Sequence, residues 1–141
     1  MRTQVSYPHW LYRQSAVIPY RVRHGQIEIL LITTRKGRWI VPKGVIEPDL
    51  SPAQSAGKEA LEEAGVSGVI DEREIGRYTY EKWGGVCRVQ VYLLRVARML
   101  NSWEEDHFRA RQWLPLQKAI ATISESALRR LLRKVPGRVK T

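Results

Sequence analysis

Cysteine and long apolar runs are the scarcest features of this sequence. Cys87 is its only cysteine, so no disulfide can form within the chain and nothing points to an oxidising compartment. No stretch approaches the roughly 18 consecutive apolar residues that a membrane-spanning helix needs. The first ten residues also lack the apolar centre of a signal peptide. We therefore expect a cytoplasmic protein without a membrane partner, in which Cys87 is a small buried side chain.

Acidic residues are outnumbered by basic ones. The chain has 141 residues, which suits one domain with its own core, and its formal net charge is +10. Such a charge favours a polyanionic partner, either a nucleic acid or a small molecule that carries many phosphates, and does not distinguish the two. The sequence is compatible with a monomer or a homodimer.

Hydrophobic patterns divide the chain into strands and helices. Residues 1–14 are expected to form an N-terminal arm, and residues 15–141 a single domain. Pro19 lies in the first strand and indicates an edge position or a bulge there. The expected architecture is α/β, a mixed β-sheet packed between helices, with a hairpin formed by the first two strands. The expected strands are 15–22, 27–33, 39–41, 69–80, 86–97 and 111–114, and the expected helices are 52–64, 115–120 and 124–135.

Three glutamates, Glu59, Glu62 and Glu63, follow the spacing i, i+3, i+4. On a helix this spacing brings the three carboxylates to one face, where like charges repel each other. A hard divalent cation such as Mg2+ or Mn2+ would offset the repulsion, because it takes oxygen ligands and keeps waters for a phosphate-bearing substrate. Taken alone, such a charge run is more commonly a solvated helix face.

The residues around the glutamates define where this helix begins and ends. Ser51 can cap its N-terminus, Pro52 suits the first helical position, and Gly65 is typical of a C-terminal stop. Gly44 ends an apolar run and begins the loop that leads into the helix. The fixed spacing of Gly44 and Gly65 around the glutamates favours a functional site over a solvated face.

The stretch from Gly44 to Val66 resembles the Nudix box, G-x5-E-x7-R-E-U-x-E-E-x-G-U, where U is a bulky aliphatic residue. Three positions depart from this pattern: Leu50 replaces the first Glu, Lys58 replaces the Arg, and Ala60 replaces an aliphatic residue. The box is therefore degenerate. The segments RWIVPKGVIEP and WEEDHFRARQWLPLQKAI are similar to the diadenosine-polyphosphate and diphosphoinositol-polyphosphate phosphohydrolase branch of the family.

The resemblance implies a Nudix α/β/α sandwich and metal-dependent hydrolysis of a phosphoanhydride bond. It implies that Glu59, Glu62 and Glu63 hold the Mg2+ or Mn2+ ions, and that Glu59 also serves as general base. Lys58 would hold Glu59 in place, although an ammonium lacks the planar fork of arginine. Glu47 is a candidate to replace part of the missing first glutamate. We expect activity that is reduced or altered in its metal preference.

Basic residues near the box are candidates for binding substrate phosphates, by paired hydrogen bonds from arginine or as a point charge from lysine. Their alternative is an ordinary surface cation. Gly44 would let the backbone approach the substrate closely. The acidic loop Glu104–Asp106 is a further candidate for the general base, with a solvated turn as its alternative. The phosphate-binding candidates are Arg35, Arg38, Lys43 and Arg88.

Aromatic and histidine side chains add few candidates. Trp83 stands beside two glycines and is a candidate for stacking on a base, whereas Trp39 and Trp113 lie on short strands and are expected in the core. The three histidines have no partner at metal-ligand spacing and are expected at the surface. The basic C-terminal helix is expected to pack by its leucine stripe, with a nucleic-acid patch as the alternative.

Three functions are compatible with these features. The first is a pyrophosphohydrolase that acts on a polyphosphorylated small molecule: a diadenosine polyphosphate, another nucleotide or a diphosphoinositol phosphate. The second is removal of pyrophosphate from RNA 5′ ends, which the positive charge favours. The third is a binding or regulatory protein that kept the fold and lost catalysis, which Leu50, Lys58 and Ala60 favour.

Overall fold

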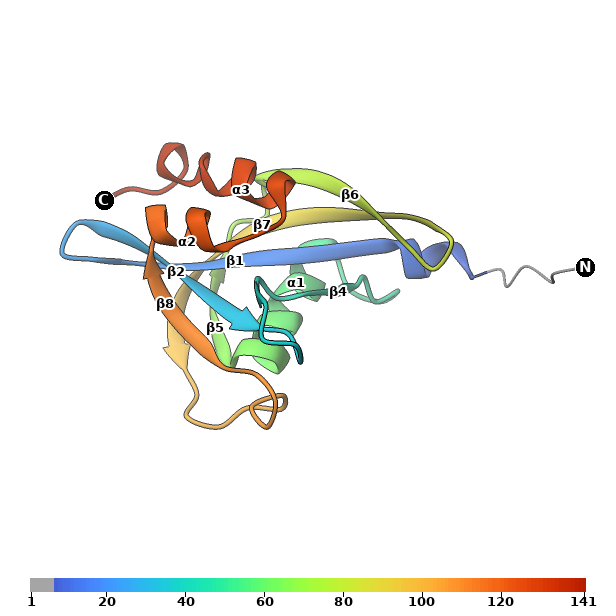
Figure 1. The fold of residues 1–141 in the computed structure, drawn as a ribbon, viewed down its shortest axis with the longest axis horizontal. Helices are drawn as coiled ribbons and strands as arrows, with labels where there is room; N and C mark the ends of the chain where they lie inside the picture. The colour runs from blue at the N-terminus through green and yellow to red at the C-terminus, as the bar shows by residue number, and fades with distance from the viewer. Residues whose placement is uncertain (1–6) are drawn as a thin grey trace, which may run out of the picture.

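Eight strands form one mixed sheet in the computed structural model, which describes residues 7–141 (Figure 1). The strands are β1 (Arg13–Arg23), β2 (Gln26–Thr33), β3 (Trp39–Ile40), β4 (Lys43–Val45), β5 (Val66–Ile70), β6 (Gly76–Lys82), β7 (Gly85–Met99) and β8 (Arg111–Pro115). The helices are α1 (Pro52–Glu59), α2 (Leu116–Thr122) and α3 (Ser126–Leu132), and the short helical turns are η1 (His9–Tyr12), η2 (Ala60–Ala64) and η3 (Val135–Gly137). Within the described residues, no helix is long and apolar enough to cross a membrane.

Two long strands, β1 and β7, lie side by side and parallel within the sheet. β1 also forms the expected hairpin with β2, with pairs from Tyr20 and Ile29 to Arg23 and Gln26. Closer to its N-terminus β1 pairs with β4, while β2 pairs with β3 and β8. The change of partner along β1 places the β4 segment, which carries Gly44, next to the start of β1.

Pro19 lies inside the sheet, so the expected edge position is wrong. On one side β1 pairs with β7, where Pro19 is opposite Leu94. On the other side the pairs with β4 end at Ala16 and the pairs with β2 begin at Tyr20. The proline therefore falls in the gap between two partners, where its missing N–H removes no pair with β4 or β2.

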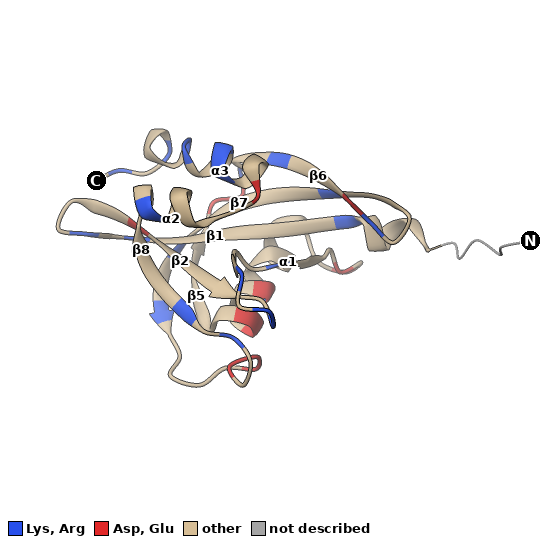
Figure 2. Cartoon of the chain, viewed as in Figure 1, with Lys and Arg blue, Asp and Glu red and all other residues tan. Residues whose placement is uncertain are grey.

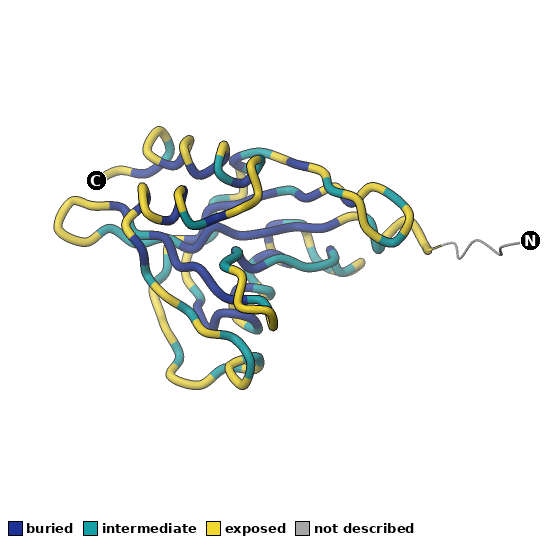
Figure 3. The backbone as a smooth tube through the Cα atoms, viewed as in Figure 1, coloured by how far each residue is buried: buried dark blue, intermediate teal, exposed yellow. Residues whose placement is uncertain are grey.

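Helices cover both faces of the sheet, which confirms the expected α/β/α arrangement (Figure 1). On one face Val89 of β7 shares a core with Leu128 of α3 and with α2. On the other face α1 packs through fully buried alanines, Ala56 among them, against a core that includes Tyr92. Alanine side chains are short, so the helix approaches the sheet closely. Figure 3 shows the buried segments concentrated in the central strands and the exposed ones in the loops.

The region 69–80, expected as one strand, is interrupted. It contributes to β5 and β6, which both pair with β7. The C-terminal segment stabilises the loop between β5 and β6. Arg138 donates hydrogen bonds to Asp71 Oδ2 at 2.9 Å and to the Glu74 carbonyl oxygen at 3.2 Å. Local periodicity could not show this break, because a residue 67 positions away stabilises it. The expected C-terminal helix is also shorter, since α3 ends at Leu132 and η3 follows.

The first described residues pack on the turn between β6 and β7. β1 begins at Arg13, inside the expected arm, and η1 precedes it. Tyr12 Oη donates a hydrogen bond to the Trp83 carbonyl oxygen at 2.6 Å, and the two rings meet edge to face. Trp83 therefore packs against the N-terminal segment, with a positive φ of 56° in the turn. Residues 1–6 of the expected arm lie outside the described part of the chain.

Candidate active site

Helix α1 begins as its sequence indicates. The Ser51 side chain accepts a hydrogen bond from the Gln54 backbone N–H at 3.1 Å, and the Gln54 side chain accepts one from the Ser51 N–H at 2.9 Å. This reciprocal capping box, with Pro52 in the first turn, fixes where the helix starts. The start point determines how Glu59 is turned toward β4.

The segment η2, which continues α1, is π-helical. It contains Glu62 and Glu63 and ends at Gly65, whose left-handed backbone (φ 66°, ψ 32°) confirms the expected stop. Arg111 of β8 donates a hydrogen bond to the Ala64 carbonyl oxygen at 2.8 Å, and so satisfies a group that the helix end leaves free. Single π turns within helices are frequent at functional sites.

Glu59 and Glu63 form the centre of the site. Glu63 is only 5% exposed, and its carboxyl group lies next to that of Glu59. Burial, and after it the adjoining Glu59, raises the pKa of Glu63 to about 9. The backbone N–H of Lys43 donates to Glu63 Oε1 at 3.4 Å. Glu63 is therefore held in its protonated form beside a second carboxyl group, in a nearly buried place.

Gly44 is the residue against which Glu59 lies. A Cβ atom at position 44 would be 2.2 Å from Glu59 Oε1 and 2.4 Å from the carboxyl carbon. No side chain fits there unless the Glu59 carboxyl moves. This contact explains the fixed spacing between the glycine and the helix.

Gly44→Ala is therefore expected to lower kcat by roughly 100-fold, because a displacement of about 1 Å is enough to disrupt catalytic geometry. The fold should persist, since the clashing atoms are the end of a side chain. Gly57→Ala is the matched control: a Cβ there meets nothing within 4 Å, so we expect unchanged kcat and a gain of about 0.5–1 kcal/mol in stability. Turnover and thermal unfolding of both variants test this; a fully active Gly44→Ala protein would contradict it.

Arg109, in the loop before β8, offsets part of the negative charge. Its guanidinium lies 3.6 Å from Glu63 Oε1 and 2.8 Å from Glu105 Oε1, and it donates to the Thr33 carbonyl oxygen at 2.8 Å. The Glu105 backbone N–H donates to the Glu62 carbonyl oxygen at 3.1 Å. The acidic loop thus packs on the end of the helix, and Figure 2 shows acidic positions on both segments.

Lys58 contacts carboxylates other than the expected one. Its Nζ lies 2.6 Å from Glu47 Oε1 and 3.7 Å from Glu62 Oε1, and within the described chain it forms no ion pair with Glu59. The hydrogen bond to Glu47 is the largest cause that raises the pKa of Lys58. Adjacent residues of a helix point in different directions, which explains why Lys58 misses Glu59. Gly44 restrains Glu59 instead.

The carboxylates suit a hard divalent cation, although they are not drawn into a closed ligand set. Within residues 7–141, no three Asp, Glu, His or Cys side chains converge into a complete metal site. A cation in place of the Glu63 proton would relieve the repulsion between the carboxylates of Glu59 and Glu63. Burial, and next Glu59, also raises the pKa of Glu62. Mg2+ and Mn2+ accept such oxygen ligands and complete their shells with water.

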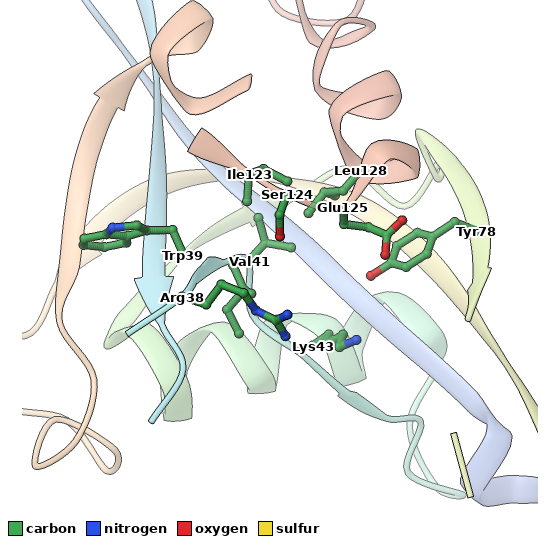
Figure 4. Close-up of a pocket in the computed structure, with 10 residues that line it drawn as sticks. Arg38, Trp39, Val41, Lys43, Tyr78, Ile123, Ser124, Glu125 and Leu128 are labelled. Carbon is green, nitrogen blue, oxygen red and sulfur yellow. The ribbon is translucent and has the colours of Figure 1, made fainter. Parts of the chain in front are cut away.

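The candidate phosphate-binding residues lie in three separate places. Arg38 and Lys43 line a pocket of about 180 Å³ on the α3 side of the sheet (Figure 4). Arg35 stacks on Phe108, with its guanidinium carbon 3.9 Å from the ring centroid. Arg88 is on β7, on the opposite face of the sheet from this pocket. They therefore do not form one phosphate clamp.

The pocket at Lys43 combines apolar walls with a few polar groups. Lys43 Nζ lies 3.8 Å from the centroid of the Tyr80 ring. Burial, and after it the charge of Lys82, lowers the pKa of Lys43. Because the Lys43 backbone also contacts Glu63, the pocket lies beside the glutamate centre. Its lining includes Trp39, Val41, Tyr78, Ile123, Ser124, Glu125 and Leu128.

The loop before β8 supplies further contributors to the site: Arg109 received no role from the sequence, whereas Glu105 belongs to the acidic loop that was a candidate for the general base. Arg109 and Glu105 reach the glutamates from a loop, and Trp103 Nε1 donates to the Glu63 carbonyl oxygen at 2.9 Å. The sequence signal for Arg109 and Trp103 was that they belong to a segment similar to one branch of a known family. The expectations for the tryptophans and histidines agree with the structure. Trp39 and Trp113 are partly buried and pack against the two cores, and all three histidines are exposed.

Comparisons with known sequences all identify the same family. The chain matches the NUDIX domain family over residues 11–135. Nudix hydrolase 21, chloroplastic, of Arabidopsis thaliana is 35% identical over 129 residues, which cover 86% of this chain and 65% of that protein. Diphosphoinositol polyphosphate phosphohydrolase 3-alpha of Homo sapiens is 31% identical over 126 residues, which cover 86% of this chain and 75% of that protein. The chain spans less than two thirds of the length of the Arabidopsis relatives Nudix hydrolase 21, 16 and 4.

Solved structures repeat the fold. A C. elegans Ap4A hydrolase in a binary complex superposes with a TM-score of 0.75 at 26% identity, over 89% of this chain and 96% of that chain. The NUDIX domain of Shewanella oneidensis NrtR, complexed with ADP ribose, gives a TM-score of 0.73 over 95% of this chain and 91% of that chain. Its identity is only 16%, so this second likeness shows the fold alone.

Proposed function

Because this chain belongs to the Nudix family, we propose that it is a divalent-metal-dependent hydrolase that cleaves a phosphoanhydride bond in a polyphosphorylated small molecule. The observation that carries this proposal is the buried carboxyl pair, Glu59 and Glu63, held against Gly44. A buried acid beside a second carboxyl destabilises a fold unless something compensates for it. Perturbed groups of this kind are concentrated at functional sites.

The described side chains divide the work of such a reaction. Glu59, Glu62 and Glu63 would hold Mg2+ or Mn2+, which supplies charge neutralisation at the phosphoryl oxygens and a water of lowered pKa. Glu59 is the candidate base, since its carboxyl adjoins Gly44, where a phosphate chain can approach the backbone. Arg109 favours the ionised form of Glu63, which is the form that binds a cation.

The pocket at Lys43 supports a nucleoside polyphosphate as the substrate. Its volume of about 180 Å³ is below the roughly 300–1,000 Å³ of sites that hold a whole ligand, so it suits one ring of the substrate. Val41 and Leu128 offer apolar contacts, and Tyr78 an aromatic one. Glu125 can accept a hydrogen bond from a ring amino group, whereas it would repel the phosphates of an inositol phosphate.

Phosphate release from a substrate panel tests this function. The panel contains diadenosine polyphosphates, nucleoside triphosphates, ADP-ribose, a diphosphoinositol phosphate and triphosphorylated RNA, each with Mg2+ and with Mn2+. We expect turnover of nucleoside polyphosphates that stops when a chelator is added. Turnover of RNA alone would favour the 5′-end pyrophosphohydrolase, to which the net charge of +10 also points. Tight binding of one member without any turnover would favour a binding or regulatory protein.

Lys43→Met tests the pocket itself. We expect KM for the nucleoside polyphosphate to rise about tenfold while kcat changes little, because the variant loses one charge-assisted contact to bound substrate. Lys36→Met removes the same charge from an exposed loop and should leave KM unchanged. Equal effects of the two substitutions would show that only net charge matters.

A further inference from the structure

Three arginines of β1, β6 and β7 lie on the face of the sheet that carries α1, and Arg130 of α3 lies beside them at the sheet edge formed by β6. Arg13 of β1 is in register with Arg88 of β7, and Arg88 with Thr79 of β6. Arg77 of β6 is in register with Gln90 of β7, one step further along the same face. These residues line a groove of about 810 Å³. We call it the arginine groove, and its polar lining is Arg13, Arg77, Thr79, Arg88, Gln90 and Arg130.

Three arginines of the groove, Arg13, Arg88 and Arg130, form no ion pair within the described chain. Within the described chain, only Arg77 of this set forms an ion pair, with Glu74 at 2.7 Å. Arg13 and Arg88 are exposed, and Glu81, which lies on the same face of β6, pairs with neither of them. Like charges on neighbouring strands repel each other, so this arrangement is unfavourable unless an anion lies between them.

The arginines of the strands in the groove point away from the pocket at Lys43, although Tyr78 lines both hollows. Val89 points into the core shared with α3, so Arg88 before it points to the opposite face. Ser15, which pairs with Gly44 on one side and with β7 on the other, is fully buried and lies between the groove and the glutamates. Of the described residues that line the groove, none is one of the three glutamates.

We propose that the arginine groove binds an oligophosphate anion independently of the bond-cleaving centre. Arg13 and Arg88 stand on strands about 4.8 Å apart, so both guanidinium groups can bind oxygens of one multiply charged anion. Thr79 and Gln90 add neutral hydrogen-bond donors beside them. The groove volume of about 810 Å³ is within the range of small-molecule sites, roughly 300–1,000 Å³. This binding does not rest on the proposed hydrolysis.

Titration calorimetry with inorganic tripolyphosphate, in the presence of a chelator, tests the proposal on the full chain. Arg13→Gln/Arg88→Gln should weaken binding by about tenfold for each arginine, as expected for the loss of a charge-assisted contact. Arg95→Gln/Arg98→Gln is the matched control, because it removes two exposed arginines from the other end of β7. The control should bind as the unchanged protein does, and all variants should keep the same circular dichroism spectrum.

Three outcomes would overturn the proposal. In the first, Arg13→Gln/Arg88→Gln binds tripolyphosphate as tightly as the unchanged protein. In the second, the control loses as much affinity, so that the effect is one of net charge. In the third, the groove variant loses affinity for a single-stranded oligonucleotide and not for tripolyphosphate, which would make the groove a nucleic-acid site. The test measures binding and not turnover. Anion binding in the groove can therefore be disproved while the proposed hydrolysis is upheld, and hydrolysis can be disproved while anion binding is upheld.

Discussion

Glu63→Gln is expected to reduce metal-dependent hydrolysis by about 10²–10⁴-fold, the range associated with loss of one catalytic group. The variant keeps the shape of the side chain and its contact with Lys43, and removes the charge that a divalent cation needs. Its KM should change less than its kcat, since the metal acts on the reacting phosphate. Steady-state kinetics with Mg2+ and with Mn2+ would measure the loss.

Glu72→Gln is the control for this experiment. Glu72 is exposed in the segment between β5 and β6 and forms no ion pair within the described chain, so its substitution should leave turnover unchanged. Retained turnover in Glu63→Gln would contradict the proposal that this carboxylate binds the metal ion. Loss of folding in Glu63→Gln would be visible as a change in circular dichroism and would have to be separated from the kinetic effect.

The same substitution is expected to stabilise the metal-free protein at alkaline pH. The unfolded chain releases the Glu63 proton near its ordinary pKa of 4.5, whereas burial and Glu59 hold the folded pKa at about 9. Between these values the folded state binds more protons than the unfolded state, so stability falls as pH rises. Glu63→Gln removes this loss, and the difference should grow by on the order of 2 kcal/mol from about pH 6 to pH 8.

Thermal unfolding in a chelator across this pH range would measure the difference, which corresponds to a rise in Tm of several degrees. Added Mg2+ or Mn2+ should reverse the trend in the unchanged protein, because a metal binds the deprotonated carboxylates and its affinity rises with pH. A metal-free Glu63→Gln protein that shows the same pH dependence as the unchanged one would contradict the raised pKa of Glu63.

Local signals predicted the helix of the site closely. Ser51, Pro52 and Gly65 act through hydrogen bonds and backbone angles within a few residues, so their effect on the ends of the helix can be read from the sequence. The hairpin of β1 and β2 was predictable for the same reason, since its turn is short. The position of Pro19 was not, because it depends on where β1 changes from one partner strand to another.

The sequence could not show which charged side chains of the site are buried or which of them contact one another. The spacing of Glu59, Glu62 and Glu63 predicted three carboxylates on one face of a helix. In the structure, Glu63 is buried in the π turn, whereas Glu62 lies beside Lys58. Arg109 enters the site from a loop that is distant in sequence. Such contacts depend on how β8 and its preceding loop pack against α1, which no local pattern encodes.

The sequence by itself thus determined which residues can carry the chemistry: the glutamates, the glycine at fixed spacing from them, and the helix that presents them. Only the tertiary structure decided how their charges are arranged, because burial and neighbours set a pKa and both arise from packing. It also separated the basic residues, placing Lys43 in a pocket on one face of the sheet and Arg88 in the arginine groove on the other. Strand register, which alternates side chains between two faces, is the physical reason for that separation.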